Sequence, residues 1–241
     1  MKTPKKPAKS YRKLFITILQ KDIKSEIRQI NDIFSIILFG IISIFIFSSA
    51  YNTVNLGVRM PIEIFVIQIW LIIFFTLIFI MIKLFVQEKE KGTLYGLTSS
   101  PVSNSVLLIS KAVFCFILLS FIELILILFS FFISIPSIQS LNLNEFLLYI
   151  MIGIILPTLD LSICGTLVSA LSMYSKNKSF VLPLLLFPII LPITSPIISL
   201  NIKLLEGELI SMIVIELLFL LAHAILMFSI LIFVSDELLS E

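Results

Sequence analysis

Six apolar runs, each long enough to cross a lipid bilayer as a helix, recur along this chain. A bilayer core of ~30 Å is crossed by about 20 helical residues. Of the 241 residues, 59% are hydrophobic and only 13% are charged, which is too little charge to cover a soluble domain. The sequence therefore predicts an all-α fold, a polytopic membrane helix bundle with six transmembrane helices at 33–51, 62–84, 112–135, 146–171, 180–200 and 209–234.

The basic residues are distributed unevenly between alternate connections. Nine of the 17 Lys and Arg residues precede the first run, four lie between residues 83 and 111, and two follow residue 172. The other set of connections holds only Arg59 and Lys203. Because connections rich in Lys and Arg stay on the cytoplasmic side, fifteen against two predicts a multi-pass protein of the cytoplasmic membrane with both termini cytoplasmic. The basic arm is expected to face anionic lipid, and no nucleic acid partner is expected.

The segment before the first run has a helical pattern of its own. Its apolar residues recur at helical spacing under a basic face: Phe15, Leu19, Ile23, Ile27 and Ile30. This pattern predicts an amphipathic helix in the membrane interface, and a helix that packs on a partner protein is the alternative. The predicted organisation is a cytoplasmic basic arm with the interfacial helix at 1–32, a six-span permease domain at 33–234 and a cytoplasmic tail at 235–241.

The motifs of soluble enzymes and nucleotidases are absent from the sequence. None of the seven glycines belongs to a GxxxxGK[ST] motif, so the chain has no P-loop for ATP. With one His and one Trp, it also lacks the paired axial histidines and Trp-rich loop expected of a heme-holding membrane protein. We expect no catalytic residue, no metal site and no directly bound cofactor. Cys115 and Cys164 lie inside apolar runs and are interpreted as packing residues.

The connection after the second span combines charge, a glycine and a short apolar ridge. The charged run leaves the bilayer, the glycine permits a sharp turn, and two leucines three residues apart are followed by a proline. This pattern predicts a short amphipathic helix that docks another subunit, with an ordinary solvated loop as the alternative. The predicted docking residues are Glu88, Glu90, Gly92, Leu94, Leu97 and Pro101.

The fifth span contains four prolines, and the spans also contain four ionisable residues away from their ends. Pro183, Pro188, Pro192 and Pro196 are expected to interrupt the helix, either as a moving part of a transporter or as a static kink. Charged groups at such depth usually face an interior or a cavity. The predicted intramembrane polar path, or set of buried pairs, is Glu123, Asp160, Glu216 and His223. His223 and Glu216 are seven residues apart and are predicted to form a pair.

Two of these segments carry a family resemblance. The pattern Glu88-x-Glu90-x-Gly92-x-Leu94-x-x-Leu97-x-x-x-Pro101, followed by Lys111, resembles the corresponding connection of ABC-2 type transporter permeases. Together with Leu156-Pro-Thr-Leu-Asp-Leu-Ser-Ile-Cys-Gly-Thr and the proline run from Leu182, it resembles the heme exporter protein B (CcmB) family. Lys89 and Lys91 make this loop more basic than is usual in that family.

The resemblance implies a permease subunit of an ABC transporter that serves heme delivery in cytochrome c biogenesis. It also implies that a separate ATPase subunit binds the ATP, that heme is a transported or partner-bound ligand, and that other cytochrome c maturation membrane proteins are partners in a homodimer or hetero-oligomer. The ATP-driven step either moves heme or releases a heme-loaded chaperone. The alternatives are an ABC-2 exporter of a drug, lipid or polysaccharide, and a non-transporting membrane scaffold.

Overall fold

The computed structural model describes residues 8–55, 58–90, 92–93, 96, 103–134, 136, 143–208 and 210–238. Within these ranges the regular structure is helical, apart from one isolated bridge between Met60 and Pro136. In chain order the elements are α1 (Ala8–Arg28), α2 (Ile30–Asn55), α3 (Ile62–Met81), the π-helical turn η1 (Ile82–Val86), α4 (Gln87–Glu90), α6 (Asn104–Ser134), α7 (Leu143–Leu148), the π-helical turn η2 (Tyr149–Ile155), α8 (Leu156–Ser172), α9 (Lys178–Leu205), α10 (Ile210–Phe233) and α11 (Ser235–Leu238).

The predicted number of spans is confirmed. Six helices in the described part of the chain are long and apolar enough to cross a membrane: Ile30–Asn55, Ile62–Glu90, Asn104–Ser134, Phe146–Ser172, Phe180–Leu205 and Ser211–Phe233. The largest difference is in the third, where α6 begins eight residues before the predicted span. Its 31 residues extend for about 46 Å, longer than a bilayer core, so one end of α6 projects beyond the core.

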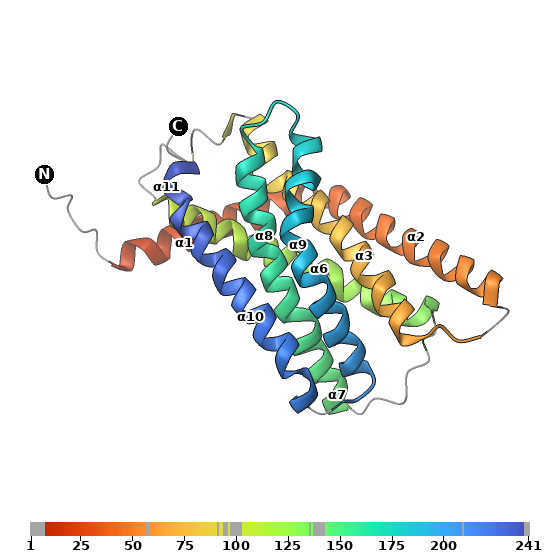
Figure 1. Cartoon of the computed structure of the whole chain (residues 1–241). Coiled ribbons are helices and arrows are strands. Elements are labelled where there is room, and N and C mark those ends of the chain that lie inside the picture. Colours follow the sequence, from red (N-terminus) through yellow and green to blue (C-terminus); the bar gives the residue numbers. More distant parts are fainter. Residues whose placement is uncertain are drawn as a thin grey trace, which may run out of the picture.

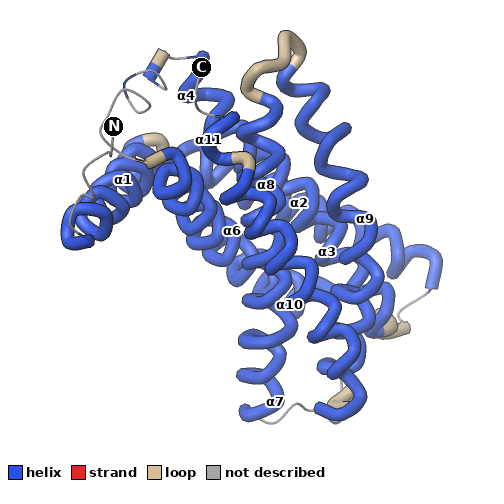
Figure 2. Tube along the Cα trace, turned by 60° about the vertical axis from the view of Figure 1, so that its left-hand side comes forward, coloured by secondary structure: helices blue, strands red, loops and turns tan. Residues whose placement is uncertain are grey.

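The six long helices form one bundle whose ends carry the short elements. α4 and α11 lie at one end, and α7 lies at the other (Figure 2). α1 crosses the bundle at a steep angle to α8 and α10 and packs against α6 (Figure 1). α1 therefore exists as a separate helix, and its predicted place in the membrane interface stays a prediction.

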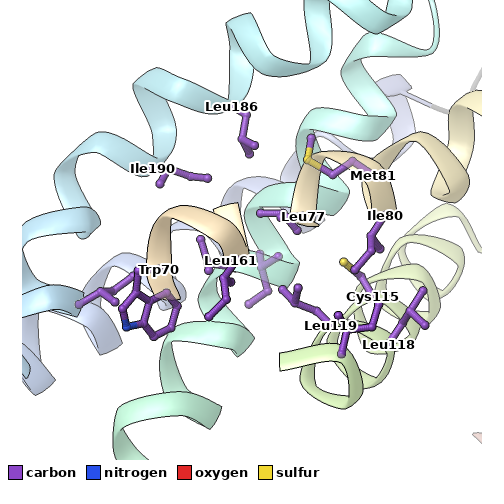
Figure 3. Close-up of a cluster of buried hydrophobic side chains, with 14 of the residues drawn as sticks. Trp70, Leu77, Ile80, Met81, Cys115, Leu118, Leu119, Leu161, Leu186 and Ile190 are labelled. Atoms are coloured by element: carbon purple, nitrogen blue, oxygen red, sulfur yellow. The ribbon is translucent and has the colours of Figure 1, made fainter. Parts of the chain in front are cut away.

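α3 is the central helix of the bundle. In its most apolar stretch 61% of the residues are buried, against 22% for α2 and for α10. Figure 3 shows its side chains packed among those of three neighbouring helices, with the labelled residues Trp70, Leu77, Ile80, Met81, Cys115, Leu118, Leu119, Leu161, Leu186 and Ile190. Large apolar side chains cover the exposed faces of α2 and α10, as a lipid-facing surface requires.

A close backbone approach fixes the packing of α3 on α8. A Cβ atom at Gly165 would lie 3.0 Å from Leu77 Cδ1 and 3.2 Å from Met81 Cγ. Beside it, the Ser169 hydroxyl donates a 2.7 Å hydrogen bond to the Met81 carbonyl. The small residues on α8 thus let a backbone carbonyl of α3 bond to a neighbouring helix inside the bundle.

The prolines do not divide the helix of the fifth span, as was predicted for a broken helix, and the alternative of a static kink stays a prediction. α9 runs as a helix from Lys178 to Leu205 with Pro183, Pro188, Pro192 and Pro196 inside it. Each proline removes one backbone hydrogen bond, but the helix continues because the bilayer offers the chain no alternative structure that satisfies its other backbone groups. Next to this run, the Thr194 hydroxyl donates to the Ile190 carbonyl at 3.0 Å.

Candidate functional site

The most highly charged part of the described structure lies where α1 meets the ends of α3 and α6. Its members are three lysines and four acids, which we call the charged junction: Lys21, Asp22, Glu26, Asp32, Lys83, Glu88 and Lys111. They come from α1, α2, η1, α4 and α6. Elements from three separate parts of the chain therefore meet through ion pairs.

Lys111 is the most buried member of the charged junction, with a side chain that is 2% exposed. Its ammonium nitrogen lies 2.8 Å from Glu88 Oε1 and 3.1 Å from Asp22 Oδ2. Lys21 joins the same two acids, at 2.7 Å from Glu88 Oε1 and 3.1 Å from Asp22 Oδ1. Burial alone would lower the pKa of Lys21, but the hydrogen bond and charge of Glu88, together with Asp22, raise it overall.

The third lysine of the charged junction ties α1 to the start of α2. Lys83, on η1, donates a short hydrogen bond to Glu26 and lies 3.3 Å from Asp32 Oδ2. The buried face of α1 is therefore Ile18, Asp22 and Glu26, one turn apart. The predicted apolar stripe does not coincide with this buried face, because Ile27, one of its members, is 63% exposed.

Between α1 and the ends of α3 and α6 lies an open groove of about 930 Å³. All members of the charged junction except Asp32 line it, together with Lys24, Arg28, Thr93 and Gly96. A groove with charges of both signs, some of them exposed, suits contact with another polar protein surface.

The predicted docking residues fall partly inside the described structure. Gly92 has φ +70°, in the left-handed region, and its N–H bonds to the Lys89 carbonyl at 3.2 Å, so the predicted turn is confirmed. The Thr93 hydroxyl bonds to the Glu88 carbonyl at 3.1 Å. Glu90 is exposed, whereas the Glu88 carboxylate faces the chain's own lysines. Leu94, Leu97 and Pro101 lie outside the described residues.

The intramembrane ionisable residues find partners on other helices. His223 Nδ1 on α10 lies 3.0 Å from Asp160 Oδ1 and 2.9 Å from Asp160 Oδ2 on α8. The predicted pair between His223 and Glu216 is wrong. Seven residues place both on one face, but they also separate them by about 10 Å along the helix, so each bonds at its own depth.

Glu216 and Glu123 make two further contacts between helices. Glu216 Oε1 lies 2.7 Å from the Lys203 ammonium and accepts a 2.9 Å bond from the Ser199 hydroxyl, so it joins α10 to α9. Glu123 on α6 accepts a short hydrogen bond from Thr158 on α8. These contacts offset part of the cost of placing the two groups in a bilayer, because each carboxyl group bonds through one oxygen while its other oxygen is buried without a partner among the described residues. A polar translocation path through these residues stays a prediction.

A comparison with known families identifies the family of this chain. The family model described as CcmB protein matches residues 13–237, nearly the whole chain. The chain belongs to the CcmB family. No curated protein and no solved structure matches it. The family is that of heme exporter permeases of cytochrome c biogenesis, so this CcmB-family chain is a transporter permease subunit and a multi-pass membrane protein, not a catalytic enzyme.

The sequence did not predict the structural role of several residues. Lys111 was noted as a basic residue of a connection and in the family pattern, but its almost complete burial was not predicted. Asn201 is also buried, and its amide donates to the Gly153 carbonyl in η2 at 3.0 Å. Cys164 lies one turn after Asp160, and its thiol approaches that carboxylate at 3.7 Å. The four-residue spacing was a signal that both face one way.

Proposed function

We propose that this chain couples ATP hydrolysis on a separate ATPase subunit to heme delivery for cytochrome c biogenesis. In this proposal both termini, α4 and the start of α6 are cytoplasmic, and the loop that follows Gly92 docks the ATPase. The subunit works in a homodimer or hetero-oligomer with other cytochrome c maturation membrane proteins. Heme is a transported or partner-bound ligand in this scheme, and ATP reaches the chain only through the partner.

The observation that carries this proposal is the charged junction. Glu88 lies four residues before Gly92, after which the docking loop begins, and it forms ion pairs with Lys111 beyond the loop and with Lys21 on α1. In this proposal a push on the loop is transmitted to α6 through Lys111 and on to α1 through the Lys111–Asp22 pair, because ion pairs with little exposure resist separation. Family membership supports heme as the substrate. The charged junction supports the loop after Gly92 as the place where the ATPase acts on the chain.

Co-purification tests the proposal. The full chain is expressed with its native partners, purified through a tag, and examined by mass spectrometry and ATPase assay. We expect an ABC ATPase subunit to be present. Replacing Leu94 and Leu97 together with Asp is expected to abolish its association, since charges would replace an apolar contact core.

A matched control uses the other end of the molecule. Val54, near the end of α2, and Val58, in the connection to α3, are exposed, at 79% and 61%. Their double replacement with Asp is expected to leave ATPase association unchanged. An ATPase that still co-purifies at normal yield with the Leu94→Asp/Leu97→Asp chain would place the docking site elsewhere. Absence of any ATPase from the wild-type complex would overturn the proposed coupling.

A further inference from the structure

Three side chains with different metal-binding chemistry meet inside the bundle. Asp160 and Cys164 are four residues apart on one face of α8, and His223 approaches them from α10. One ligand atom from each of the three side chains lies within 4.8 Å of the other two. Neither the charged junction nor the proposed ATPase contact involves these residues.

We propose that Asp160, Cys164 and His223 bind a divalent transition-metal ion of the zinc class. One carboxylate oxygen, the thiolate sulfur and imidazole Nδ1 are the three protein ligands. A thiolate and an imidazole select Zn²⁺, Co²⁺ and similar ions over Mg²⁺ and Ca²⁺, which take oxygen ligands. Cys164 is thus more than a packing residue.

The separations between the ligand atoms fit such an ion. Tetrahedral bonds of ~2.3 Å to sulfur and ~2.1 Å to oxygen or nitrogen place sulfur and oxygen about 3.6 Å apart and nitrogen and oxygen about 3.4 Å apart. The structure has Cys164 Sγ 3.7 Å from Asp160 Oδ1, and His223 Nδ1 3.0 Å from the same oxygen. The third separation, between His223 Nδ1 and Cys164 Sγ, is within 4.8 Å. An ion would complete the three corners if the nitrogen–oxygen pair opened by about 0.4 Å and nitrogen and sulfur came to about 3.6 Å.

Charge balance favours the ion at this depth. Asp160 and Cys164 are fully buried, and His223 is the only charge partner that the described contacts give Asp160. A dication with one carboxylate, one thiolate and a neutral imidazole has no net charge, so it avoids most of the cost of an isolated charge in a bilayer. Binding releases the thiol proton, and also one imidazole proton where the ring carries two.

Three protein ligands leave one tetrahedral position open. Closed structural zinc sites use four protein ligands, whereas sites with three hold an exchangeable fourth ligand. The side chain of His223 is 11% exposed, so the protein does not enclose the cluster completely. The site is therefore suited to an ion with an exchangeable ligand.

Cobalt titration tests the site. The full chain, purified with its partners in lipid nanodiscs and treated with chelator, is titrated with Co²⁺. We expect one equivalent to bind with a thiolate-to-cobalt charge-transfer band. Cys164→Ser should abolish the band, and Asp160→Asn or His223→Gln should weaken binding about 10-fold or more. Cys115→Ser is the matched control, because Cys115 is also buried in a span but does not belong to the cluster, and this variant should keep the band.

Absence of a saturable band in the wild-type chain would overturn the proposal. So would a band that survives Cys164→Ser or disappears in Cys115→Ser. Size-exclusion profiles show whether each variant is folded. Should Cys164→Ser misfold, X-ray absorption at the cobalt edge of the Cys115→Ser chain decides, since one sulfur ligand supports the site and none excludes it.

Discussion

The ammonium nitrogen of Lys111 lies 2.8 Å from Glu88 Oε1, although the two residues stand on opposite sides of the loop that joins α4 to α6. The same Lys111 nitrogen reaches Asp22 on α1 at 3.1 Å. One buried cation thus closes the base of the proposed docking loop and holds the N-terminal helix against it. This geometry explains why a loop that follows one span can act on two other helices.

Lys111→Met is expected to destabilise the chain by about 2–3 kcal/mol. It leaves two acids of the charged junction with less compensation, and the open groove admits some water, so the cost falls below that of a fully buried pair. Thermal unfolding of the purified chain measures the effect. Lys24→Met, an exposed lysine on the same groove, is the control and should leave stability unchanged. Equal stability of the two variants would show that the junction contributes nothing.

The topology gives a second prediction. In a background with Cys115→Ser and Cys164→Ser, a cysteine introduced at Glu90 should react with a membrane-impermeant reagent only from the cytoplasmic side. A cysteine at Val58 should react only from the other side, because both positions are exposed and lie on opposite sides of the span Ile62–Glu90. Labelling of position 90 from outside would reverse the orientation and remove the proposed ATPase contact.

Much of the architecture followed from the sequence because it depends on local patterns. Apolar runs define membrane spans by their length, and Gly92 marks a turn because few other residues adopt its positive φ. The partners of the buried charges could not be predicted in this way. Whether His223 contacts Glu216 or Asp160 depends on how α10 packs against α8. The spacing of residues within one helix does not specify this packing.

The face of α1 that is buried could not be predicted from its local sequence pattern either. The charged residues of an amphipathic helix are expected at its solvated face, and the apolar ones against the bundle. Here Asp22 and Glu26 face inward because they form ion pairs with Lys111 on α6 and Lys83 on η1. Only the tertiary arrangement brings those lysines to α1.

Close packing of α3 on α8 gives a third prediction. Gly165→Val should destabilise the chain by about 1–3 kcal/mol, because the added carbons have no room beside Leu77 and Met81. Thermal unfolding in detergent measures the change. Gly96→Val is a suitable comparison, since no atom of the described residues lies within 4 Å of a Cβ at that position. If both variants unfold at the wild-type temperature, the approach of the two helices is looser than described.

The pair formed by His223 and Asp160 gives the last prediction. In chelator-treated protein, His223→Leu should lower stability by about 2 kcal/mol, because it leaves a carboxyl group buried without its partner. Adding Asp160→Leu should recover most of that loss, since both polar groups are then gone and two helices keep an apolar contact. A double variant as unstable as the sum of the single changes would show that the residues do not interact.

The same variant tests whether His223 ligates heme. One histidine supplies one axial ligand, and its Nδ1 is already directed at Asp160. We therefore expect His223→Leu to leave any heme content of the purified complex unchanged while altering transport-coupled ATPase activity. The heme absorbance band and the ATPase rate are measured on the same preparation. Loss of the band in a folded variant would instead make this histidine a heme ligand, and Asp160 the group that orients its ring.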